Sequence, residues 1–205
     1  MDVLILAGGA SRRLRGADKP MVEIGGRTLL DRVIDACAEE AEPGGGSVVV
    51  VGPPRPTARP VRWVREEPPG GGPVAAIAAG LTAGADPWVG VFAADLPFLT
   101  RETVHSLWMA AARARSACDG AVAVDAAGRE QWLAAVYRRE ALASRLGPIG
   151  ANAGFALRRV VHDLALVRLA QPGDAVLDCD TWEDVVTARR IADRGRAPQT
   201  RPSTP

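Results

Sequence analysis

The sequence predicts a single α/β domain built on a doubly wound, mostly parallel sheet. Short apolar runs alternate along the 205 residues with segments of helical periodicity, which is typical of strands and helices that follow one another in turn. The apolar runs are continuous, and this indicates strands that are buried on both faces. Two glycine-rich segments directly follow predicted strands, at the carboxyl ends where doubly wound proteins bind ligands.

The first half of the chain contains four predicted strands and two predicted helices. The run DVLIL (2–6) ends at two glycines and is interpreted as the first strand. A helix follows, because apolar residues recur at helical spacing from Leu29 to Cys37 before PGGG breaks the chain. Further strands are predicted at SVVVV (47–51), PVRWV (60–64) and WVGVFA (88–93), and an alanine-rich helix over Pro73–Leu81 accommodates proline in its first turn.

The second half continues this alternation. Thr100 is predicted to cap a helix, and Thr181 is predicted to start the last helix, with Asp184 at capping-box spacing. Strands are predicted at 120–124, 132–137, 164–169 and 175–180, and a further helix at 139–146. Residues 1–193 are interpreted as one domain, and residues 194–205 as a disordered tail, since they have little apolar surface to bury.

Composition narrows the class of ligand. The chain has 25 basic and 24 acidic residues, a net charge of +1, so nothing in its charge favours nucleic acid or a membrane surface as partner. No apolar run approaches the roughly 20 residues that span a bilayer, and no secretory signal is recognisable. Cys37, Cys118 and Cys179 form no zinc or disulfide pattern. A cytoplasmic protein with small-molecule ligands is expected.

The loop LILAGGASRRLRGADKP (4–20) ends close to Lys19, the only lysine in the chain. Backbone N–H groups freed by glycine, followed by the positive end of a helix, can bind an anion without side chains. The loop adds Arg12, Arg13, Arg15 and Lys19 to that arrangement. It is neither a Walker A loop nor a G-x-G-x-x-G loop. A compact ammonium can follow a phosphate through a change of geometry, whereas a planar guanidinium needs one bidentate alignment.

This loop resembles the L-A-G-G-x-S-x-R-M-G-x-D-K signature of the MobA-like nucleotidyltransferases, whose members include molybdenum cofactor guanylyltransferases. REEPPGGGPVAAIAAGL, FAADLPFLT, REQWLAAVYRR and DCDTWEDV are similar to further motifs of that family and occur in the same order. The resemblance covers residues 1–193. It implies a Rossmann-like fold of the nucleotide-diphospho-sugar transferase type.

The resemblance also implies roles for individual residues. Lys19 and Arg13 are expected to act on the phosphates, Glu67 stands for the acidic nucleotide-binding residue of the family, and Asp95 for its magnesium ligand. The complete implied nucleotide site is Leu6, Ala7, Gly8, Gly9, Lys19, Gly52, Glu67 and Asp95. A carboxylate at the end of an apolar strand needs a partner, and Mg²⁺ that bridges Asp95 to triphosphate would supply one.

The segment DCD departs from the family, which has asparagines at Asp178 and Asp180 in a stretch linked to the pterin acceptor. If both aspartates face Asp95, three carboxylates share one cleft and repel one another unless a cation lies between them. One interpretation is therefore that Asp178 or Asp180 completes the magnesium site. The alternative places Asp180 at the start of the last helix and leaves Asp178 in solvent. Trp132 also departs from the family, where proline is usual.

The expected activity is a magnesium-dependent nucleotidyl transfer, in which an acceptor phosphate attacks the α-phosphorus of a nucleoside triphosphate and pyrophosphate leaves. By resemblance, the expected pair is GTP and molybdopterin, with protein partners in cofactor delivery. The alternatives are a related transferase with another base or phosphorylated acceptor, of the cytidylyl, phospholactate or sugar-phosphate type, and a non-catalytic nucleotide-binding module. Lys19 and Asp95 argue against the last of these.

Overall fold

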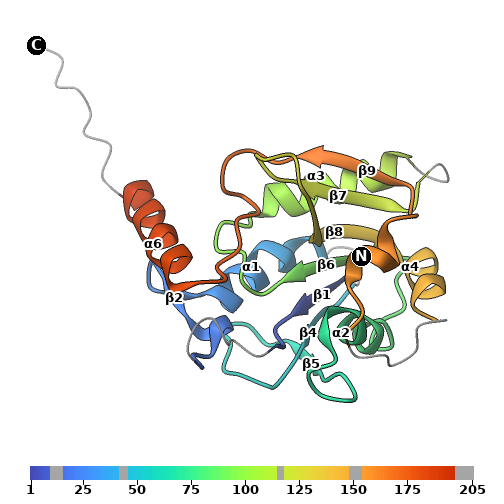
Figure 1. Cartoon of the computed structure of the whole chain (residues 1–205), viewed down its shortest axis with the longest axis horizontal. Helices are drawn as coiled ribbons and strands as arrows, with labels where there is room; N and C mark the ends of the chain where they lie inside the picture. Colours follow the sequence, from blue (N-terminus) through green and yellow to red (C-terminus); the bar gives the residue numbers. More distant parts are fainter. Residues whose placement is uncertain (10–15, 42–45, 115–117, 148–153, 197–205) are drawn as a thin grey trace, which may run out of the picture.

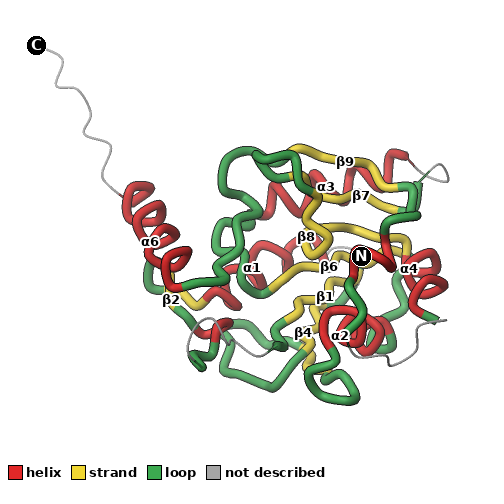
Figure 2. Tube along the Cα trace, in the orientation of Figure 1, coloured by secondary structure: helices red, strands yellow, loops and turns green. Residues whose placement is uncertain are grey.

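The computed structural model describes residues 1–9, 16–41, 46–114, 118–147 and 154–196, which form one sheet covered by helices on both sides (Figures 1 and 2). The strands of this sheet are β1 (Asp2–Leu6), β4 (Val48–Val51), β5 (Arg62–Val64), β6 (Trp88–Ala93), β7 (Gly120–Val124), β8 (Glu130–Arg138) and β9 (Leu166–Ala170). The helices are α1 (Leu29–Ala41), α2 (Gly72–Leu81), α3 (Arg101–Ala114), α4 (Arg139–Leu146), α5 (Leu157–Val161) and α6 (Trp182–Arg196). A 3-10 turn, η2 (Lys19–Met21), and a hairpin of β2 (Glu23–Ile24) and β3 (Arg27–Thr28) lie between β1 and α1.

The sheet has the strand order β5-β4-β1-β6-β8-β7-β9 and is mostly parallel, as predicted. Strand β8 is the exception, since it runs antiparallel to both β6 and β7. It follows β7 through a short turn in which the N–H of Asp125 donates to the carbonyl of Arg129, and Gly128 supplies a positive φ of 78°. The first residues of β8 therefore lie at the edge of the sheet where β6 ends.

Side chains of successive strand residues enter two separate cores. On β1, Val3 and Ile5 pack on the side covered by α1 and α3, whereas Leu4 packs on the side covered by α2, α4 and α5. Because both faces of the sheet are covered, every one of these positions has to be apolar. This explains the continuous apolar run VLIL that follows Asp2.

Helix α6 belongs to a third, smaller core and lies at one end of the molecule, beside β2 (Figure 1). The predicted capping box is confirmed: the Thr181 hydroxyl accepts from the Asp184 N–H at 3.2 Å, and the Asp184 carboxylate accepts from the Thr181 N–H at 2.7 Å. The predicted strand at 175–180 is wrong. The Leu177 N–H donates to the Asp174 carbonyl in a turn and the Cys179 N–H donates to the Asp95 carbonyl, so no ladder forms.

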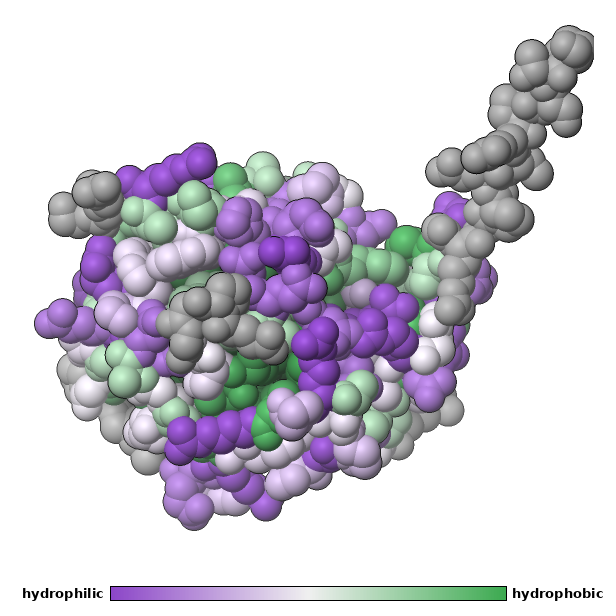
Figure 3. Space-filling model, turned by 180° about the vertical axis from the view of Figure 1, so that it is seen from behind, coloured by the Kyte–Doolittle hydropathy of each residue, from purple (hydrophilic) through white to green (hydrophobic). Residues whose placement is uncertain are grey.

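The surface carries mixed polarity. Seen from behind, hydrophilic side chains cover most of the face, and apolar side chains gather in a hollow near its centre (Figure 3). Among the described residues, the structure contains no helix with both the length and the apolar character to cross a membrane.

At the amino end of β1, away from the glycine-rich loop, Asp2 is buried in a polar network. Its carboxylate accepts from the N–H and hydroxyl of Ser47 at 3.0 Å, from the N–H of Asp86 at 3.0 Å, and from Nη2 of Arg139 at 2.6 Å. Burial alone would raise the pKa of Asp2, but the donors on Asp86 and Ser47 outweigh it and hold that pKa below its ordinary value. This network joins β1, β4, β6 and α4 through one side chain.

We expect Asp2→Ala to lower the free energy of unfolding by about 3 kcal/mol, because it leaves the Arg139 guanidinium with an uncompensated buried charge. Urea unfolding of the two proteins at pH 7 measures the difference. Since the pKa of Asp2 is lowered by folding, its contribution is complete above the ordinary aspartate value and is lost as the pH falls through the folded value. A difference that stays constant from pH 7 down to pH 3 would contradict this assignment.

Candidate active site

The carboxyl ends of β4, β1 and β6 bring three loops to one edge of the sheet. The Ala7 N–H donates to the carbonyl of Val51 at 2.8 Å, and the Ala94 N–H donates to the carbonyl of Leu6 at 3.1 Å. These bonds continue the sheet one residue past the strands. Gly8, Gly52 and Asp95 therefore follow neighbouring strands at the same edge, as expected for loops at the carboxyl ends of a parallel sheet.

Gly52 allows the loop after β4 to approach the loop after β1 closely. Its φ is 148°, and a Cβ at this position would lie 2.9 Å from the carbonyl carbon and oxygen of Ala7 and 3.0 Å from the nitrogen of Gly8. Only glycine fits such an approach between two backbones. Gly8 and Gly9 remain exposed beside it, so Ala7–Gly9 and Gly52 form an open, backbone-lined cradle.

An acidic side chain closes the cradle, but the structure places Glu66 there instead of Glu67. Glu66 is 5% exposed; its Oε1 accepts from the Gly70 N–H at 3.0 Å and would lie 3.3 Å from a Cβ at Gly8. Its Oε2 is buried and has no hydrogen-bond partner among the described residues, although such an atom normally has one. Glu67 is exposed to solvent. The acidic side chain aimed at the cradle is therefore Glu66.

Lys19 is the first residue of η2, and its ammonium lies between two carboxylates. It forms an ion pair with Asp95 at the end of β6 and a 2.6 Å hydrogen bond and ion pair with Asp180, which is 161 residues away in sequence. The Lys19 side chain is only 15% exposed. Burial disfavours the ammonium, but the charges of Asp95 and Asp180 outweigh it and hold the pKa of Lys19 above its ordinary value.

Asp95 and the segment 178–180 are joined through the backbone as well. The Cys179 N–H donates to the carbonyl of Asp95 at 3.2 Å, while the Cys179 side chain is fully buried against α1 and α6. With Cys179 turned into the protein, its two neighbours Asp178 and Asp180 both reach the cleft. The expectation that these three aspartates share one cleft is confirmed.

The three carboxylates differ in their surroundings. Oδ1 of Asp95 is buried and has no hydrogen-bond partner among the described residues. Asp178 is open to solvent on one side; even so, burial, together with repulsion from Asp95 and Asp180, raises its pKa above the ordinary aspartate value. Asp95 thus pairs with Lys19 through one oxygen only. A cation bound beside Asp178 would relieve the repulsion that this carboxylate experiences.

A cavity of about 430 Å³ opens beside Asp95. Its walls come from the end of β6, the start of β8, α5 and the segment 178–180. The lining residues are Ala93, Asp95, Leu96, Glu130, Gln131, Trp132, Leu133, Ala134, Leu157, Arg158, Asp178 and Asp180. Asp95 follows β6, which has β1 and the cradle on one side and β8 and the cavity wall on the other, so the cradle and the cavity lie on the two sides of Asp95.

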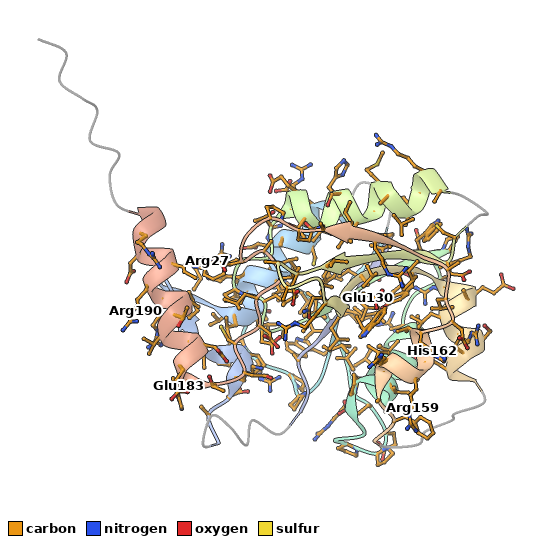
Figure 4. All side chains as sticks on the ribbon, turned by 45° about the horizontal axis from the view of Figure 1, so that its top comes forward. Arg27, Glu130, Arg159, His162, Glu183 and Arg190 are labelled. Carbon is orange, nitrogen blue, oxygen red and sulfur yellow. The ribbon has the colours of Figure 1, made fainter. Side chains whose placement is uncertain are left out.

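The wall formed by β8 was not predicted from the sequence. Glu130, Gln131 and Trp132 enter the cavity because β8 is reversed, and a strand pattern alone does not give strand direction. Gln131 donates to the Asp125 carboxylate at 2.9 Å, which couples this wall to the β7–β8 turn. Figure 4 shows Glu130 within the body of the molecule, whereas Arg159 lies on α5, His162 directly follows that helix, and Glu183 and Arg190 lie on α6.

The predicted phosphate-binding residue Arg13, together with the rest of residues 10–15, lies outside the described residues. Within the described ranges, no group of three histidine, cysteine, aspartate or glutamate side chains converges closely enough to form a ready metal centre. The donor set still fits a hard cation, because Asp95 has an unpartnered buried oxygen and carboxylates are the ligands that Mg²⁺ prefers. The Lys19 ammonium, which pairs with Asp95 and Asp180, supplies positive charge at this point.

Comparison with known proteins agrees with this geometry. The family model described as "MobA-like NTP transferase domain" matches residues 3–168. A probable molybdenum cofactor guanylyltransferase of Mycobacterium tuberculosis (strain ATCC 25618 / H37Rv) is 38% identical over 151 residues, 70% of each chain. The molybdenum cofactor guanylyltransferase of Bradyrhizobium sp. (strain ORS 278) is 34% identical over 217 residues, 92% of each chain.

A similar solved structure supports the fold. The crystal structure of molybdopterin-guanine dinucleotide biosynthesis protein A from Archaeoglobus fulgidus has a TM-score of 0.71 at 21% identity, and the match covers 95% of this chain and 100% of the other. At that identity the likeness concerns the fold alone. Together with the family match, which spans most of the sheet and the residues of the cradle, it leads to one conclusion: this chain belongs to the MobA-like NTP transferase family.

Proposed function

We propose that the chain transfers the guanylyl group of GTP to molybdopterin and releases pyrophosphate. The observation that carries the proposal is the position of Asp95 between a backbone cradle and a cavity of about 430 Å³. The family match and the names of the two curated relatives support the choice of substrates. In this reaction a phosphate oxygen of the acceptor bonds to the α-phosphorus while the bond from that phosphorus to the bridging oxygen of pyrophosphate breaks.

The nucleotide is assigned to the cradle. Ala7, Gly8 and Gly9 present backbone without side-chain cover, and Gly52 keeps the facing loop close. Glu66 is a carboxylate that could accept hydrogen bonds from the N–H groups of a guanine, and its unpartnered Oε2 gives a reason to do so. The acidic residue of the nucleotide site is accordingly proposed to be Glu66, in place of Glu67.

The phosphates are assigned to the region of Lys19. To reach a phosphate, the ammonium has to exchange part of its contact with Asp95 and Asp180 for phosphate oxygens. Asp95, with Asp178 or Asp180 beside it, is proposed to hold Mg²⁺. When bound, the ion neutralises charge on the phosphate oxygens. The chain's own part is to orient the nucleotide in the cradle, keep the acceptor in the cavity in line with it, and hold the two close together beside Asp95.

The residues that line the cavity also support a second candidate function, with a different acceptor. Asp178 and Asp180 occupy positions where the family pattern has asparagine, and both line the cavity together with Trp132, where proline is usual. Bare carboxylates repel an anionic acceptor unless a cation screens them. A related transferase with another base or another phosphorylated acceptor is therefore the alternative proposal, and it uses the same cradle.

The cysteines agree with a reducing compartment. Cys37, Cys118 and Cys179 are all buried as free thiols, and burial with the nearby charge of Asp95 raises the pKa of Cys179 to about 12. A thiol with such a pKa remains protonated and unreactive. We propose the cytoplasm as the site of action.

A pyrophosphate-release assay tests the function. Four nucleoside triphosphates are combined with molybdopterin, a sugar phosphate and phospholactate in the presence of Mg²⁺, and GTP with molybdopterin is expected to be the active pair. Asp95→Asn is the matched control and should lose at least about 100-fold in kcat, because a neutral amide is a poor ligand for a hard cation. Turnover with a different pair would select the alternative, and nucleotide binding without turnover by any pair would indicate a binding module.

Lys19→Arg is expected to lower kcat/KM almost as far as Lys19→Ala, by about 100-fold or more, although it keeps the charge. The guanidinium is planar and its donors point in fixed directions, so it cannot follow a phosphate through a change of geometry as a compact ammonium can. Because Lys19 is the only lysine, an amine-reactive nucleotide analogue can label only this side chain and the terminal amine. Labelling of the terminal amine alone, with no protection by GTP, would contradict the assignment.

Asp178→Asn is expected to raise the melting temperature of the ligand-free protein at pH 7. The pKa of Asp178 is raised by folding, so the folded protein binds the extra proton more tightly, and stability falls as the pH rises through that folded value. The gain should shrink as the pH is lowered toward the ordinary aspartate value. Scanning calorimetry in chelator measures it, with Asp193→Asn as the exposed control. A lower melting temperature for Asp178→Asn would show that the carboxylate has a structural role.

A further inference from the structure

The Arg55 guanidinium, on the connection between β4 and β5, makes an unusual set of contacts with the loop after β1. Nε donates to both oxygens of Asp18 at 2.9 and 2.8 Å, and Nη2 pairs with Asp18 at 2.8 Å. Nη1 donates to the carbonyls of Ala7 at 3.0 Å and Pro53 at 2.9 Å. The Arg55 side chain is 12% exposed, whereas the Asp18 side chain is 49% exposed, so the guanidinium is largely buried and its carboxylate partner is open to solvent on one side.

These contacts join the two ends of one segment. Ala7 lies just before the glycines of the cradle, and Asp18 lies just before Lys19. A single guanidinium therefore bridges the Ala7 backbone next to the cradle and Asp18, the residue that precedes Lys19. The planar fork of arginine suits this task, because its donors point in fixed directions toward a carboxylate on one side and carbonyls on the other.

The side chain of Asp18 is free to take part in the bridge, because Pro20 offers no N–H for it to cap. Asp18 is the N-cap residue of η2, a position where aspartate normally accepts a hydrogen bond from the first turn. Its side chain makes no such bond; only its backbone carbonyl does, accepting from the Met21 N–H at 2.9 Å. The carboxylate is turned to Arg55 instead.

The same contacts exclude direct action of Arg55 on the nucleotide as its main role. Donors on all three nitrogens of the guanidinium are engaged by protein oxygens. We propose that Arg55 is a positioning residue that sets the distance and orientation between the Ala7–Gly9 cradle and Lys19. The proposal rests on the proposed function of the cradle as a nucleotide site.

Titration calorimetry with Mg²⁺ and GTP, without acceptor, tests the proposal directly. Arg55→Ala is expected to raise the dissociation constant at least about 10-fold, because both ends of the segment lose their charge-assisted bonds. Arg55→Lys keeps the charge but not the fork, and should show most of the same loss while it folds normally. Asp18→Ala should show only part of this loss, since the bonds from Arg55 to the carbonyls of Ala7 and Pro53 remain, and the double variant should be no worse than Arg55→Ala.

Arg59→Ala is the matched control, since Arg59 lies on the same connection and pairs with Asp35 of α1 at 2.9 Å, away from the cradle. It should leave GTP affinity within twofold. In the steady-state assay, Arg55→Lys should raise the KM for nucleotide and leave the KM for acceptor within twofold, since the cavity lies on the other side of Asp95. A purely structural role would move neither constant at temperatures where the variant is folded.

The outcomes separate the inference from the function it rests on. Failure of the wild-type protein to bind any nucleoside triphosphate would refute the proposed function. Binding by wild type and by Arg55→Lys with equal affinity would overturn the inference on Arg55 alone. An equal loss in Arg59→Ala would also overturn it, because the whole connection and not the guanidinium bridge would then set nucleotide affinity.

Discussion

The ion pairs of Lys19 with Asp95 and Asp180 are the interaction on which the rest of the site depends. Without a cation at this point, carboxylates from the end of β6 and from the segment before α6 would repel one another across the cleft. With the ammonium in place, three segments far apart in sequence are held together. The Cys179 N–H, donated to the carbonyl of Asp95, adds a backbone contact to the same junction.

Much of the fold could be predicted because both faces of its central strands are covered. Short, continuous apolar runs such as 3–6 and 88–93 are typical of strands that are buried on both faces, and they coincide with β1 and β6. The hairpin of β2 and β3 was missed because two-residue strands carry no periodicity. The segment 175–180 was mistaken for a strand because its apolar residues alternate with polar ones, although its N–H groups are used in a turn and at Asp95.

The site could be predicted in part for a related reason. Loops at the carboxyl ends of neighbouring strands must meet, so the glycine-rich loops and the segment of Asp95 are expected at one edge of the sheet. The assignment of Gly8, Gly52 and Asp95 to a nucleotide site comes from the resemblance to the family. The contact of Lys19 with Asp180 spans 161 residues and depends on how α6 docks, which no local pattern encodes. Likewise, the sequence does not indicate which of the adjacent residues Glu66 and Glu67 is buried. In the structure, the buried side chain is that of Glu66.

The reversed direction of β8 affects how substitutions can alter the two pockets of the site. The cradle is assembled from residues before Gly72, whereas most of the cavity wall comes from residues after Asp125, with Asp95 at the boundary between them. Substitutions in the β7–β8 hairpin can therefore reshape one pocket while the other keeps its backbone. Under the proposed function, binding of the nucleotide and binding of the acceptor can therefore change independently by mutation. A chimaera that exchanges only the β7–β8 hairpin would alter the acceptor pocket alone.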